Sequence, residues 1–167
     1  VPGDPNDGST NTQITVNVNG NKTATAVFKR DFTITVATAG AGSGAVSPAA
    51  GSHTYTFLDE VTFTAAPAPG SAFSHWQGGL TGSNNPATLT VTGDATVTAW
   101  FVPTYPLSVT IQGSGSVAKS PNLQNYPAGT TVTLVANPGA GYAFDSWSGD
   151  ASGSAETVDV VMNSAKS

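Results

Sequence analysis

The sequence predicts an all-β protein made of tandem modules of about 70 residues, each a small β-sandwich or β-grasp-like fold. Valine and threonine alternate with other residues in several short segments, a pattern typical of strands buried on one face. The 19 glycines and 11 prolines favour frequent turns. Windows of ten or more residues with the apolar spacing of a helix are absent from the sequence.

The chain repeats itself at an offset of 71 residues. The segment GSAFSHWQGGLTGS at 70–83 matches GYAFDSWSGDASGS at 141–154. Outside this motif the same offset aligns further apolar positions: Val46 with Val117, Tyr55 with Tyr126, Val61 with Val132, and Leu89 with Val160. Agreement spread over so many positions indicates tandem repeats.

A partial third copy stands at the front of the chain. ITVNVNGNKTATAVF at 14–28 matches ATLTVTGDATVTAWF at 87–101, the tail half of a repeat. The last copy stops at Ser167, the counterpart of Thr96, before a counterpart of VTAWF. The expected organisation is tail strands of a preceding repeat at 1–30, a first full repeat at 31–103, and a second repeat lacking its last strand at 104–167.

Each element of the first full repeat follows from local pattern. Alternating or short apolar segments predict strands at 32–38, 60–66, 72–76, 87–93 and 95–101. GAGSGAV at 40–46 and PAPG at 67–70 are expected to form turns, because glycine adopts positive φ and proline fits loops better than ladders. The last two strands are expected to form a hairpin across Gly93-Asp94.

The linkers between repeats are short. KRD at 29–31 and VPTYP at 102–106 are expected to hold successive modules at limited angles. Pro103 and Pro106 are expected to stiffen the second linker.

Composition excludes several classes of function. The net charge is −5 with only five Lys and Arg, so the chain has no basic patch for nucleic acid. It has no cysteine and therefore neither disulfides nor thiolate metal sites. No apolar run reaches the length of a membrane span.

The aromatic residues of the repeated motif allow two interpretations. An exposed tryptophan could stack on a sugar ring, or the aromatics could anchor a turn to the core. Their recurrence in both repeats favours the core, because every module needs a core but not every module needs a ligand. The predicted core anchors are Phe73, Trp76, Trp100, Phe144 and Trp147, with the Trp147 ring packed against TVTLVA at 131–136.

Metal binding and catalysis are weakly supported. Asp145 and Asp150 could supply oxygen ligands for calcium, but the first repeat has Ser74 and Gly79 in their places. The histidines, His53 and His75, belong to no nucleophile motif. We therefore expect no catalytic residue, no metal site, no cofactor and no enzymatic activity.

The segment YPAGTTVTLVANPGAGYAFDSWSGDASGS resembles the divergent class of internalin-B-type repeats, the bacterial B-repeat family. The first repeat departs from the pattern at Gly79, the counterpart of Asp150. The resemblance covers about 31–167 and the tail at 11–28. It implies tandem modules of secreted or surface-anchored bacterial proteins, often stalks and adhesins, and supplies no catalytic residues.

The predicted function is a stalk, spacer or fibre segment of an extracellular or cell-surface bacterial protein, and the alternative is a carbohydrate-binding or adhesive module. The expected partners are neighbouring repeats or copies of the same protein, with glycans as a second class. The unfinished last repeat has two explanations: a longer array supplies the strand, or another copy donates it. The candidate donated strand is TATAVF, comprising Thr23, Ala24, Thr25, Ala26, Val27 and Phe28.

Overall fold

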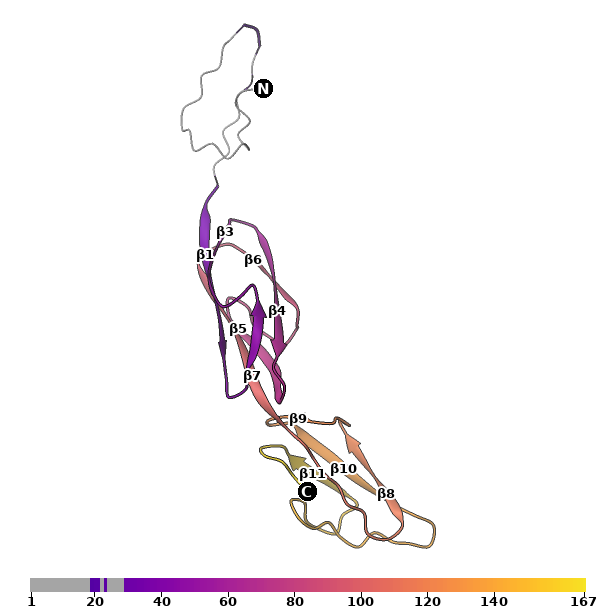
Figure 1. The fold of residues 1–167 in the computed structure, drawn as a ribbon. Helices are drawn as coiled ribbons and strands as arrows, with labels where there is room; N and C mark the ends of the chain where they lie inside the picture. Colours follow the sequence, from indigo (N-terminus) through magenta and orange to yellow (C-terminus); the bar gives the residue numbers. More distant parts are fainter. Residues whose placement is uncertain (1–18, 22, 24–28) are drawn as a thin grey trace.

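A computed structural model describes residues 19–21, 23 and 29–167. These residues form strands, turns and loops arranged as two modules end to end (Figure 1). The described part of the chain contains no helix long and apolar enough to cross a membrane. The prediction of tandem all-β modules is confirmed. Of the candidate donated strand only Thr23 is described; residues 24–28 lie outside the described residues.

The first module is a sandwich of two sheets. One sheet has the order β3-β1-β7-β5, and the facing sheet has the order β2-β4-β6. All pairings are antiparallel except that of β1 with β7, which is parallel. The strands are β1 (Asp31–Ala39), β2 (Gly44–Ser47), β3 (Gly51–Thr56), β4 (Glu60–Pro67), β5 (Ser71–Gly78), β6 (Ala87–Thr90) and β7 (Ala95–Tyr105).

Alternation along the strands builds the core between these sheets. In β4, Val61, Phe63 and Ala65 are buried while the intervening threonines are exposed. In β7, Val97, Ala99 and Phe101 are fully buried from the facing sheet. Burying an aliphatic or aromatic side chain of this size stabilises a fold by about 1.5–3 kcal/mol. The core therefore depends on β7 as much as on β4.

The predicted hairpin across Gly93-Asp94 is wrong. β6 pairs with β4, whereas β7 lies between β1 and β5 in the other sheet. The connection crosses from one sheet to the other, and Asp94 Oδ1 accepts a hydrogen bond from the Thr33 amide at 2.8 Å as it does so. A hairpin would have left β7 outside the position where its apolar side fills the core.

The predicted turn at 40–46 is wrong in its second half, because Gly44–Ser47 forms strand β2 against β4. Gly44 lies beneath the Phe101 ring, and a Cβ there would come within 2.4 Å of that ring. Glycine therefore occurs here because β2 passes close to β7, and not because the chain turns.

The second module repeats one of the two sheets. The order β11-β10-β8 is the counterpart of β6-β4-β2 in the first module. Its core contains Leu107, Tyr126, Val132, Leu134, Val160 and Met162. The strands are β8 (Gly115–Ser120), β9 (Tyr126–Pro127), β10 (Thr131–Pro138) and β11 (Thr157–Val161).

The expected linker at 102–106 is largely a strand. β7 runs on to Tyr105 and pairs with β9, Thr104 opposite Pro127 and Tyr105 opposite Tyr126. This pairing is the counterpart of the start of β1 against β3, where Phe32 lies opposite Tyr55. The last strand of the first module thus becomes the first strand of the second module.

Candidate functional site

The aromatic motif of the first module lies in its core. Trp76 is only 1% exposed, and its ring centroid lies 5.0 Å from that of Phe73 and 6.1 Å from that of Phe63. Its Nε1 donates to the Asn84 carbonyl at 2.9 Å, and its backbone N–H donates to the Gly82 carbonyl at 2.8 Å. Trp76 therefore pins the glycine-rich loop to the core.

The second module has the same turn. Trp147 Nε1 donates to the Ala155 carbonyl at 2.9 Å, and its backbone N–H donates to the Gly153 carbonyl at 2.7 Å. Phe144 lies 5.2 Å from Trp147, centroid to centroid. Trp147 packs against the second core, which includes Leu134, but stays half-buried. The motif is one structural device that meets a closed core in one module and a more open one in the other.

Trp100 is not a core anchor, and that prediction is wrong. Neighbouring residues of a strand point to opposite faces, so Trp100 points away from the core into which Ala99 and Phe101 project. Its ring stacks on His75 with centroids 5.8 Å apart, and its Nε1 donates to the Gln77 side chain. The three tryptophans consequently form no common flat face.

The two aspartates of the motif have other partners than a metal. Asp145 accepts a hydrogen bond from the Ser146 hydroxyl at 2.9 Å. Asp150 Oδ2 accepts the Ser167 amide at 2.8 Å, and Oδ1 lies 3.3 Å from Lys166 Nζ. The Ser167 backbone N–H, and after it Lys166, holds the pKa of Asp150 below its ordinary value. Within the described ranges no three His, Asp or Glu side chains gather into a metal-ligating group.

The Asp150 contacts predict a pH-dependent attachment of residues 166–167. Because the folded pKa is depressed, the stabilisation is complete above the ordinary aspartate pKa of about 3.9 and is lost as the pH falls through the folded value. We expect the Ser167 amide resonance to shift cooperatively in an NMR titration from pH 6 to about pH 2. Asp150→Asn should remove that shift. The Thr96 amide, whose neighbour Gly79 has no carboxylate, is the internal control, and an equal shift there would contradict the assignment.

Residues 166–167 occupy the beginning of the position that β7 has in the first module. Leu107 forms a parallel bridge with Lys166, as Ile34 does with Ala95. Ser108 donates its amide to the Lys166 carbonyl at 2.9 Å, and Lys166 donates to the Pro106 carbonyl at 3.1 Å. The segment that begins at Leu107 is therefore the counterpart of β1.

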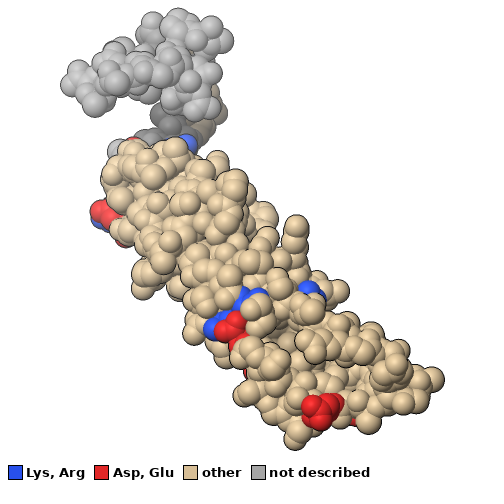
Figure 2. Space-filling view, turned by 60° about the horizontal axis from the view of Figure 1, so that its bottom comes forward, with Lys and Arg blue, Asp and Glu red and all other residues tan. Residues whose placement is uncertain are grey.

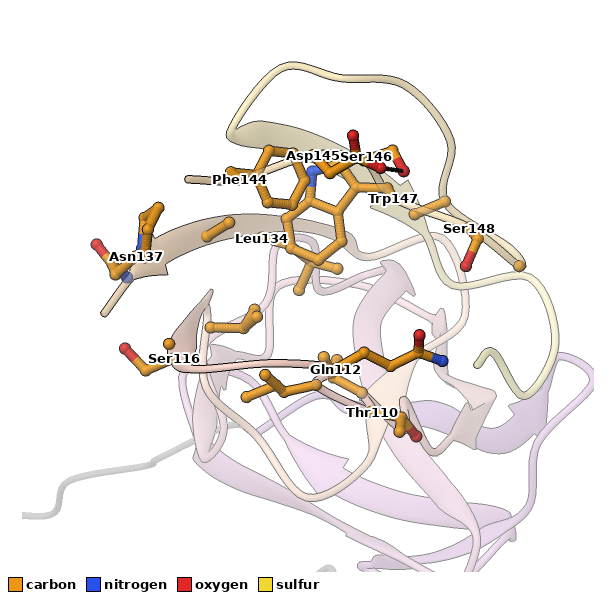
Figure 3. A pocket seen from close by; sticks show the side chains of 18 of the residues that line it. Thr110, Gln112, Ser116, Leu134, Asn137, Phe144, Asp145, Ser146, Trp147 and Ser148 are labelled. Atoms are coloured by element: carbon orange, nitrogen blue, oxygen red, sulfur yellow. Dashed lines mark hydrogen bonds between the residues drawn. The ribbon is translucent and has the colours of Figure 1, made fainter. Parts of the chain in front are cut away.

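A groove continues from this point. A cavity of about 610 Å³ lies between residues 107–112 on one side and 143–151 on the other. Figure 3 shows Phe144 and Trp147 on one wall, Thr110 and Gln112 on the opposite wall, and Leu134 between them. We name this cavity, with its two walls and its floor, the second-module groove.

The groove has apolar walls that are incompletely covered. Val109 is half-buried, whereas its counterpart Val36 in β1 is 2% exposed. Ile111 is 48% exposed. The sequence predicted an unpaired edge in this module, but it did not predict that the wall would form at 107–112. The signal is in the bridges: the first strands are offset by 73 residues, and the rest of the repeat by 71.

Comparison with known proteins identifies the repeat. A family model described as the divergent InlB B-repeat domain matches residues 34–104 and 105–167, which together make up most of the chain. Searches of curated proteins and of solved structures found no match. The boundary between the two matches falls where β7 leaves the first sheet and pairs with β9. The chain therefore belongs to the divergent InlB B-repeat family and contains two copies of its domain in tandem.

Proposed function

We propose that this chain is a structural segment, a stalk, spacer or fibre subunit, of an extracellular bacterial surface protein, and that copies join head to tail by strand donation. The observation that carries the proposal is the continuity of β7, which belongs to both modules. Membership in a family of tandem repeats supports the same function.

The joint between the modules is held from both sides. The Thr104 amide donates to the Gly70 carbonyl of the first module at 2.9 Å, and the Ala128 amide donates to the Pro103 carbonyl from the second module at 2.8 Å. Tyr105 packs against the second core. Bending at this joint would break hydrogen bonds worth about 0.5–1.5 kcal/mol each. A joint of this kind suits a spacer that keeps its length.

The surface also suits a spacer. Charged side chains are few and scattered on the face that Figure 2 shows. The whole chain has 5 Lys and Arg against 10 Asp and Glu. Such a surface offers little attraction to nucleic acid or to anionic membranes.

A carbohydrate-binding function is the less supported alternative. Trp76 lies in the core, so the two repeats do not offer a shared aromatic platform. Trp100 is the exposed-side candidate, and His75 stacks against its ring. A sugar would have to bind at this single pair, and we therefore favour the structural function.

A flexible insertion in the joint tests the spacer function. The chain has no cysteine, so spin labels at Thr54→Cys and Ala118→Cys report the distance between modules by pulsed electron resonance. We expect a narrow distance distribution in the parent chain. Inserting Gly-Ser-Gly-Ser between Pro103 and Thr104 should broaden it, because β7 then ends before its pairing with β9.

The matched control places the same insertion between Asn122 and Leu123, in an exposed loop away from the joint. It should leave the distribution narrow. A broad distribution in the parent chain would contradict the spacer function.

A further inference from the structure

We propose that the second-module groove is the acceptor site for residues 23–28 of another copy of this chain, which add as a β-strand between its two walls. The inference rests on the proposed fibre function and names its acceptor, its donor and their register. The donor strand would run parallel to residues 107–112 and antiparallel to residues 142–148.

The first module shows what such a groove holds. There β7 lies between β1, to which it is parallel, and β5, to which it is antiparallel. Its inward side chains Val97, Ala99 and Phe101 have no exposed surface. The filled position is therefore occupied by a strand whose alternate residues are apolar and end in an aromatic ring.

The second module presents the same position with its register already set. Asp150 donates its amide to the Ser167 carbonyl at 2.9 Å, as Gly79 does to that of Thr96 at 2.7 Å. Together with the bridge from Leu107 to Lys166, this contact fixes the register on both walls. A strand continuing in that register places its next residue at the counterpart of Val97.

The groove has a place for an aromatic ring at its far end. In the first module the Phe101 ring lies over Gly44 and edge-on to Phe73, with ring centroids 6.1 Å apart. The counterparts of those two neighbours are Gly115 and Phe144, and both line the groove. The third inward residue of the occupant is therefore expected to be aromatic.

The donor sequence meets these requirements. TATAVF at 23–28 aligns with TVTAWF at 96–101, which places Ala24, Ala26 and Phe28 inward. Phe28 stands six residues before Ile34, and Phe101 stands six residues before Leu107. A donated strand would thus lead into β1 of its own copy as β7 leads into the second module. The joint between copies would repeat the joint within the chain.

A chain cannot fill its own groove in this way. β1 is parallel to β7, and β7 runs toward the second module, so β1 begins at the end of the first module away from the groove (Figure 1). Residues 29 and 30 span about 7 Å at full extension, whereas the strand β7 alone is roughly 35 Å long. Donation must therefore occur between copies, and an end-to-end addition that does not close on itself builds a fibre.

The experiment compares the parent chain with a self-complemented variant. Analytical ultracentrifugation and electron microscopy should show linear assemblies of the parent chain that grow with concentration. Deleting residues 1–28 should leave monomers. Appending VTAWF after Ser167 should also give monomers, because the appended strand fills the groove of its own copy. A parent chain that stays monomeric, or a deletion variant that still assembles, would overturn the proposal.

A peptide of residues 21–30 tests the site directly in the deletion variant. We expect it to raise the melting temperature of the second module and to alter Trp147 fluorescence. Phe28→Ala in the peptide should weaken binding at least about tenfold, since it removes the ring that fills the end of the groove. Val27→Ala, on the outward side, is the matched control.

If the VTAWF extension raises the melting temperature but the peptide does not bind, the groove belongs to a continuation of the same chain and strand donation is wrong. The joint-rigidity measurement does not depend on residues 1–28. The spacer function can therefore fail or stand separately from strand donation.

Discussion

Replacing Trp76 with alanine is expected to destabilise the first module by about 3–5 kcal/mol. The indole is 1% exposed, contacts Phe63 and Phe73, and donates a hydrogen bond to the loop through Nε1. The change removes a large core side chain and leaves the Asn84 carbonyl without that donor. Because about 1 kcal/mol shifts the melting temperature of a domain of this size by about 4–8 °C, calorimetry should record a fall of more than about 12 °C in one of two transitions.

Trp100→Ala is the matched control for this measurement. The ring is of the same type but lies on the outer face of β7, where it stacks on His75. We expect a loss of about 1 kcal/mol, mainly from that aromatic contact. Equal losses at Trp76 and Trp100 would contradict the assignment of the core face.

The repeat and the core strands could be predicted from the sequence because both depend on local spacing. Val61 and Phe63 alternate with threonines, and alternation with period two shows which residues share a face. The turn around Trp76 and Trp147 was also legible, because the same residues recur 71 positions apart. These features are fixed by neighbours in the chain.

The pairing of strands could not be predicted in the same way. The short connection at Gly93-Asp94 suggested a hairpin, but β7 pairs in parallel with β1, whose first residue lies 64 positions before that of β7. Parallel pairing carries no local signal, because it depends on which strand completes a distant core. The placement of Trp100 was wrong because residue type alone does not tell which face of a strand a side chain occupies.

The candidate site was predictable only as an expectation of an unpaired edge. An open edge follows from aligning the repeats, but a groove requires that two walls stay apart around a space. Residues 107–112 form one wall because β7 hands the chain to the second module in the register of β1. That register is a property of the joint, and the joint was expected to be a linker.

Phe101→Ala is expected to destabilise the first module by about 3–5 kcal/mol, as much as Trp76→Ala. The ring is fully buried, lies over Gly44 and meets Phe73 edge-on. Val102→Ala, one residue along on a less buried position of β7, is the control and should cost far less. Calorimetry should show the first module melting lower while the second is unchanged. A loss below about 1 kcal/mol would show that the strand closing the module needs no aromatic anchor, and would remove the reason to expect Phe28 in the second-module groove.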